Sequence, residues 1–204
     1  MGQHAVRAAR DLPGDRRPLI GGAPRPAAAA RGGCPRRPDG GRLTAPVRIR
    51  PAVPDDAAAV AAVHARAGRA AWSSFLGDVL ARPEVALWRA RVAEPGLLVA
   101  ERAGRVVGFA RADEVTGEVA HLYVDPEAQG RGTGRLLLDR VLDRLRAAGH
   151  RRARLRTEER NTGPRRFYEA AGWWATGEVL EREWRGRRLR EVWYERDLRQ
   201  EPRV

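Results

Sequence analysis

A glycine-rich segment, Gln-Gly-Arg-Gly-Thr-Gly at residues 129–134, carries the residue types and spacing that point most directly to chemistry. Its three glycines tolerate positive φ angles and let a ligand approach the backbone closely. The segment opens an amphipathic run, residues 133–148, so its amides are expected at the positive end of a helix dipole. Arg131 and Arg135 add positive charge. The segment is therefore predicted to cradle an anion, and a diphosphate suits its length.

Two widespread phosphate-binding motifs do not match this segment. A P-loop ends in Gly-Lys-Ser or Gly-Lys-Thr, and this sequence contains no lysine, so that all 39 of its Lys+Arg residues are arginine. The dinucleotide fingerprint needs a third glycine at the position that Arg135 occupies. A plain tight turn is the alternative for any single glycine, but three glycines in register with a helix favour phosphate binding.

The elements that position this segment follow from the periodicity of the apolar residues. Strands are predicted at residues 47–50, 97–100, 105–110, 118–124, 151–156, 176–184 and 188–196. Helices are predicted at residues 54–72, 83–93, 133–148 and 164–171. Short turns at 103–104 and 185–187 indicate hairpins, whereas residues 118–156 are expected to form a right-handed parallel crossover. The order of elements predicts an α/β (α+β) fold.

Two blocks of the sequence resemble a known family. Residues 122–134 are similar to the central motif of the GCN5-related N-acetyltransferase (GNAT) family, whose signature is Gln/Arg-x-x-Gly-x-Gly/Ala. Asn161 and the run Arg-Phe-Tyr-Glu-Ala-Ala-Gly-Trp at 166–173 resemble the next motif of that family. The likeness covers about residues 47–198. It implies a mixed, mostly antiparallel central sheet with helices on both faces and a V-shaped opening between the two parallel central strands.

The resemblance also implies a binding site for acetyl-CoA, used as a co-substrate, and no metal. The backbone of Leu122, Tyr123 and Val124 would pair with the pantetheine arm, and a backbone amide there would polarise the thioester carbonyl. Asn161 would hold the pantetheine from the other side. The pyrophosphate would lie on six consecutive residues, namely Gln129, Gly130, Arg131, Gly132, Thr133 and Gly134.

The chemistry implied is direct attack of a neutral amine on the thioester. Tyr168 matches the family position that protonates the departing thiolate, and a tyrosine that only packs in its helix is the alternative. Glu118 is the favoured general base, whereas His121 has the more suitable intrinsic pKa and a water chain is a third option. Residues 118 and 121 face opposite sides of a regular strand, so both could point into the site only if a bulge intervened.

The remaining sequence sets the domain boundaries. Residues 1–45 are rich in Arg, Pro and Gly and poor in large apolar side chains, so we expect a disordered extension. Residues 46–198 are predicted to form the acetyltransferase domain and residues 199–204 a tail. The single cysteine, Cys34, excludes an internal disulfide. No secretory signal or membrane-spanning run is recognised, which predicts a cytoplasmic protein.

The sequence therefore predicts an N-acetyltransferase that moves an acetyl group from acetyl-CoA to a primary amine of a small molecule or peptide. Two alternative functions stay open. One is a catalytically inactive acyl-CoA-binding protein of the same fold. The other is a nucleic-acid-binding protein, suggested by the net charge of +13 but opposed by arginines spread over the whole chain. The acceptor stays open, and the last hairpin is a candidate homodimer contact.

Overall fold

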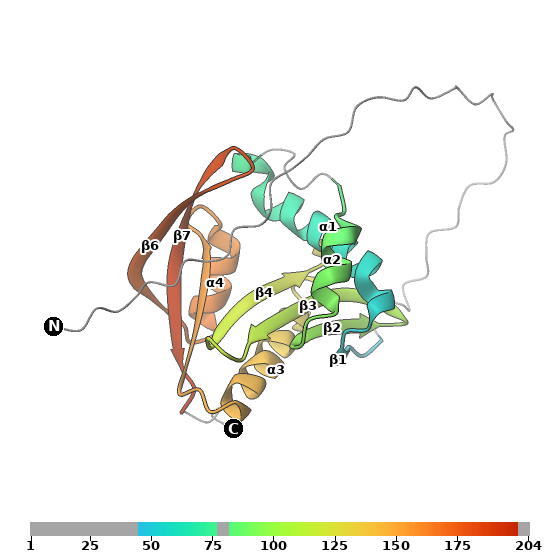
Figure 1. The fold of residues 1–204 in the computed structure, drawn as a ribbon. Coiled ribbons are helices and arrows are strands. Elements are labelled where there is room, and N and C mark those ends of the chain that lie inside the picture. Colours follow the sequence, from blue (N-terminus) through green and yellow to red (C-terminus); the bar gives the residue numbers. More distant parts are fainter. Residues whose placement is uncertain (1–44, 77–81, 200–204) are drawn as a thin grey trace, which may run out of the picture. The chain divides into compact units, whose positions relative to one another are not determined.

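The computed structural model describes residues 45–76 and 82–199, and in this part of the chain one seven-stranded sheet has the order β1-β2-β3-β4-β5-β7-β6 (Figure 1). Neighbouring strands are antiparallel except β4 and β5, which are parallel. The strands are β1 (Arg48–Pro51), β2 (Leu97–Arg102), β3 (Arg105–Asp113), β4 (Glu118–Val124), β5 (Arg152–Glu158), β6 (Trp174–Trp184) and β7 (Arg187–Asp197). The predicted mixed, mostly antiparallel sheet is confirmed.

Helices cover both faces of the sheet (Figure 1). On one face, α1 (Ala57–Leu76) and α2 (Val85–Val92) pack against β2, β3 and β4 in a cluster centred on Trp88 and Phe109. On the other face lie α3 (Thr133–Ala147) and α4 (Thr162–Ala170). The buried stripe of α3 is the one that its periodicity predicts: Leu137, Leu138, Val141, Leu142 and Leu145.

Short 3-10 turns lead into two of the helices. η2 (Pro54–Asp56) precedes α1, and the Asp56 carboxylate accepts a hydrogen bond of 2.8 Å from the amide of Val53. Asp56 thus satisfies a backbone amide at the start of this helical segment, and it also pairs with Arg50 at 2.7 Å. η4 (Pro126–Ala128) follows β4 and leads toward the glycine-rich segment.

The two parallel strands separate soon after they meet. Their register consists of one pair in the described part of the chain, Glu118 opposite Arg154. Farther along, β4 remains paired with β3 as far as Val124, which lies opposite Gly108. The edge of residues 122–124 that faces β5 is therefore open. This geometry is the V-shaped opening that the sequence predicts.

A bulge in β4 decides which side chains share a face. Val119 lies opposite Ala112 and His121 lies opposite Arg111, so Ala120 is the extra residue of the bulged strand. Glu118 and His121 consequently oppose alternate residues of β3, although they are three positions apart. Both therefore project toward the face covered by α1 and α2, where the His121 ring lies 5.3 Å from that of Trp88.

The predicted extension at residues 1–45 and tail at 199–204 lie almost wholly outside the described residues. No described helix is both long and apolar enough to cross a membrane.

Candidate active site

The glycine-rich segment forms an open loop at the start of α3. Gly130 and Gly132 have φ angles of 69° and 78°, in the left-handed region that glycine tolerates. Nothing lies within 4 Å of where a Cβ would stand at either residue. The amide of Leu136 donates to the Gly132 carbonyl at 3.0 Å, and the amides that precede it in the first turn have no partner within the helix. The loop thus leaves room and backbone donors for an anion.

The side chains of Gln129 and Asp125 hold the loop through hydrogen bonds and an ion pair. The amide nitrogen of the Gln129 side chain donates to the Val124 carbonyl at 2.9 Å, so this side chain holds the loop to the end of β4. Asp125 is buried, accepts from the amide of Glu127 at 3.2 Å and pairs with Arg66 of α1 at 2.5 Å. The loop is therefore tied to the sheet and to α1. The Gln129 side chain therefore helps to hold the loop in place, while the Gln129 backbone lies next to Gly130.

The third glycine of the loop, Gly134, lies where α3 approaches α4. A Cβ on Gly134 would stand 3.6 Å from the Phe167 ring and 3.6 Å from Val124, so the start of α3 lies close to α4. The next residue of α4, Tyr168, is 8% exposed and packs against Phe167, Trp173 and Tyr194. Burial raises the pKa of the Tyr168 hydroxyl, which keeps it protonated at neutral pH. The structure thus presents a phenol that can donate a proton.

Asn161 occupies the position before the first residue of α4. It is buried, and its backbone amide donates to the Glu158 carbonyl at 3.0 Å. Its side chain makes no capping hydrogen bond to the helix, although asparagine commonly does so at this position. No other described residue shares a hydrogen bond with this side-chain amide.

Glu118 lies at the point where β4 and β5 separate. Burial raises the pKa of its carboxyl, and Arg156 of β5, whose Nη1 is 3.1 Å from Glu118 Oε1, opposes that shift. Arg156 also contacts Glu191 of β7 at 3.0 Å, and Glu191 contacts Arg182 of β6 at 2.9 Å. We call these four residues the charge row. Sequence reasoning missed its other three members, although the alternating arginines of residues 152–156 indicate a charged strand face.

Comparisons with known proteins identify the family of this chain. Residues 65–173 match the Acetyltransferase (GNAT) family. The chain belongs to this family. The resemblance drawn from residues 122–134 and 161–173 is thereby confirmed.

Curated relatives share parts of this GNAT chain. A mycothiol acetyltransferase of Thermomonospora curvata is 40% identical over 117 residues, which are 50% of this chain and 39% of the relative. Another, from Beutenbergia cavernae, is 53% identical over 60 residues, which are 29% of this chain and 20% of the relative. The chain therefore spans two fifths or less of the length of these two relatives.

The match to solved structures covers nearly the whole length of those structures. A GCN5-related N-acetyltransferase from Rhodopseudomonas palustris has a TM-score of 0.64 at 24% identity, covering 74% of this chain and 94% of that one. A putative acetyltransferase from Salmonella typhimurium, solved with its cofactor acetyl-CoA, has a TM-score of 0.58 at 25% identity and covers 78% and 98%. The predicted GNAT fold is thus confirmed.

The two histidines near the site are held neutral in this GNAT chain. Burial, with Arg91 and Arg111, lowers the pKa of His121 to about 3, and Arg91 Nη1 lies 3.1 Å from His121 Nε2. Burial likewise lowers the pKa of His64 to about 4, where its ring packs 4.8 Å from Tyr123. A proton acceptor of such low basicity is a poor general base.

Aromatic side chains from α1, β4, β6 and β7 contact one another or the charge row. The rings of Trp72 and Trp184 meet edge to face at 6.0 Å, and Trp72 lies 6.4 Å from Tyr123. The Arg156 guanidinium lies over the face of the Trp193 ring, 5.0 Å from its centroid. Trp88, by contrast, is 2% exposed and belongs to the core. The described residues hold no cluster of three or more His, Cys, Asp or Glu side chains suited to a metal ion.

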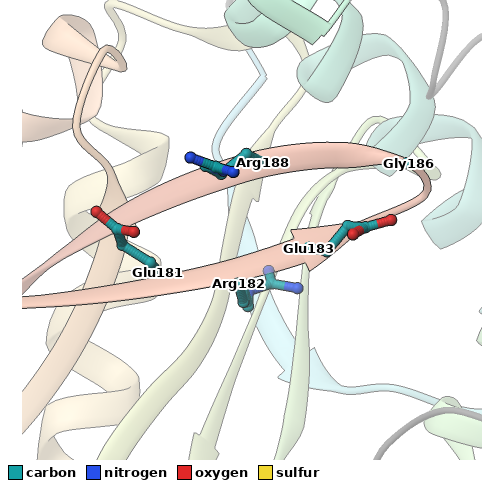
Figure 2. Close-up of a pocket in the computed structure, with 5 residues that line it drawn as sticks. All are labelled: Glu181, Arg182, Glu183, Gly186 and Arg188. Carbon is teal, nitrogen blue, oxygen red and sulfur yellow. The ribbon is translucent and has the colours of Figure 1, made fainter.

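A separate hollow of about 540 Å³ lies on the β6–β7 hairpin (Figure 2). Figure 2 shows its lining, which is almost entirely charged: Glu181, Arg182, Glu183, Gly186 and Arg188. None of these residues is a predicted site residue. Among its lining residues, Arg182 is also the outer end of the charge row.

Proposed function

We propose that this chain transfers an acetyl group from acetyl-CoA to a primary amine by direct attack. The observation that carries the proposal is the open edge of Leu122–Val124, which is joined through η4 to a glycine loop at the start of α3. An extended pantetheine arm fits the first feature, because an unpaired strand edge offers backbone donors and acceptors. A diphosphate fits the second.

Different residues would bind different parts of acetyl-CoA. The backbone of Leu122, Tyr123 and Val124 would pair with the pantetheine arm, and one amide of this edge would polarise the thioester carbonyl. The loop residues Gln129, Gly130, Arg131, Gly132, Thr133 and Gly134 would hold the pyrophosphate. The free side-chain amide of Asn161 would hold the arm from the β5 side.

Two side chains would handle the protons. Glu118 accepts the proton that the amine loses as its nitrogen bonds to the acetyl carbon, and a carboxyl of raised pKa suits this task. Tyr168 donates its proton to the coenzyme thiolate as the carbon–sulfur bond breaks. The products are an amide and the free thiol, so the proton taken up and the proton released balance.

For the acceptor we propose a small-molecule primary amine. The curated relatives named as mycothiol acetyltransferases support this class over a peptide amine. The aromatic side chains of Trp72, Trp184 and Trp193 stand on the side of the opening where Glu118 faces, which supports that side as the place of the acceptor.

The test is acetyl-CoA titration by calorimetry together with a thiol-release assay over a panel of small amines and peptides. Saturable binding with release for at least one amine is expected. Binding without release for any amine would instead support the inactive acyl-CoA-binding protein. A chain that binds no acetyl-CoA would contradict both.

A further inference from the structure

Arg102, the last residue of β2, is a buried cation beneath the glycine loop. Its side chain comes from the β2–β3 hairpin, far in sequence from the loop, and the residue is 7% exposed. One terminal nitrogen, Nη2, donates to the Thr133 hydroxyl at 3.3 Å. Thr133 is the first residue of α3 and is 1% exposed. The guanidinium therefore lies against the first turn of the helix whose amides form the loop's anion site.

The rest of this guanidinium lacks partners. Its Nε and Nη1 atoms are buried and have no hydrogen-bond acceptor among the described residues. The neighbouring carboxylate, Glu101, is engaged by Arg50 at 2.8 Å on the other side of the strand. A buried arginine without a carboxylate is unusual, because removing a charge from water is costly unless an opposite charge compensates it.

The position of the Arg102 guanidinium increases the free-energy cost of burying it. The amino end of α3 carries the positive end of the helix dipole, which disfavours a cation beside it. Helix dipole, loop amides and guanidinium thus bring three sources of positive potential to one place. An anion bound on the loop would relieve all three.

We propose that Arg102 is a binding residue for the diphosphate of the coenzyme, acting from the sheet side of the loop while the backbone amides act from its open side. The inference rests on the proposed function, which places the diphosphate on residues 129–134. Arg102 contributes its buried positive charge, and it orients Thr133 through the hydrogen bond from Nη2. The attraction acts across a buried region, where it is weakly screened by salt.

The experiment compares Arg102→Met with Arg105→Met. Arg105 lies opposite Arg102 on the same hairpin and is exposed, so both variants lose one positive charge but only the first loses the buried one. Calorimetry gives the Kd for coenzyme A, 3'-dephospho-coenzyme A, pantetheine and inorganic pyrophosphate. For Arg102→Met we expect Kd values about 10- to 100-fold higher for the three diphosphate-containing ligands, and no change for pantetheine. Arg102→Lys should recover part of the loss.

A second readout separates binding from folding. Because no carboxylate among the described residues pairs with the buried charge, Arg102→Met should raise the melting temperature of the free protein, whereas an arginine that serves only the fold predicts a lower one. Equal Kd values for coenzyme A in both methionine variants, or an equal loss with pantetheine, would overturn the inference. Wild-type protein that binds pyrophosphate in an Arg102-dependent manner but no coenzyme A would contradict the proposed function and leave the role of Arg102 standing.

Discussion

The guanidinium of Arg156 lies 3.1 Å from the carboxylate of Glu118 and joins β5 to β4 where the two parallel strands separate. Arg156 is held in turn by Glu191 at 3.0 Å and by the face of Trp193 at 5.0 Å. The carboxyl proposed as the base is therefore subject to two opposing influences. Burial raises its pKa and Arg156 lowers it, so the arginine adjusts the pH at which Glu118 becomes able to accept a proton.

Arg156→Met should move the acidic limb of the pH–rate profile. Loss of the guanidinium removes the influence that lowers the pKa of Glu118, so the carboxyl stays protonated to higher pH. The apparent pKa on the acidic limb of kcat/KM is therefore expected to rise. Arg152→Met is the control, since Arg152 projects from the same strand but pairs with Glu195 at 2.9 Å. An unchanged acidic limb in Arg156→Met would remove Glu118 from the role of base.

Gly132→Asp should abolish coenzyme binding. The substitution puts a carboxylate into the open space of the loop and strains a backbone with a φ of 78°, so the Kd for acetyl-CoA should rise by at least about 100-fold. Gly177→Asp is the matched control, because Gly177 has a φ of 85°, equally open surroundings and a place on β6 away from the loop. Calorimetric affinities that are the same for both variants would sink the assignment of the loop.

Tyr168→Phe should lower turnover and leave affinity nearly unchanged. The change removes only the hydroxyl proposed to protonate the thiolate, so kcat should fall by about 100-fold while the Kd for acetyl-CoA stays near that of the wild type. Tyr194→Phe serves as the control. Its hydroxyl is already bonded to Glu169 at 2.9 Å and to Arg165 at 3.0 Å, so this variant should lose about 1 kcal/mol of stability and retain turnover. Equal kcat values in both variants would exclude Tyr168 from the chemistry.

Acid should destabilise the fold through His121. The pKa of this histidine is lowered from 6.5 to about 3, so the unfolded chain takes up the proton first as the pH falls. Its contribution to stability is present above pH 6.5 and is lost progressively toward pH 3, at up to about 1.4 kcal/mol per pH unit. Urea unfolding at pH 7.5 and 5.5 should therefore show a smaller acid loss in His121→Gln than in the wild type.

The control for this effect is Phe109→Leu. Phe109 packs 4.7 Å from Trp88 in the same cluster but has no proton to exchange, so its substitution should lower stability equally at both pH values. A wild-type and a His121→Gln protein that lose the same stability on acidification would show that the neutral histidine does not cause the loss.

The sequence by itself determined the features that depend on neighbours along the chain. The three glycines of residues 129–134, the apolar stripe of α3 and the turn at residues 103–104 are local patterns, and the structure places each where the pattern predicts. In that turn Ala103 and Gly104 both have positive φ, which the tight hairpin requires. The family also followed from local motifs, because the glycine-rich segment of residues 129–134 is one continuous stretch of the chain.

Only the tertiary structure decided how distant residues meet. Because Ala120 is an extra residue in β4, Glu118 projects from the same face as His121, whereas in a regular strand the two would project from opposite faces. Residue types alone do not specify such a bulge, because it is a property of the pairing register. Arg102 and Arg156 are two of 39 arginines, and the sequence does not show which side chains they meet. Their roles depend on Thr133 and Glu118, which are 31 and 38 residues away along the chain and are brought near by the sheet.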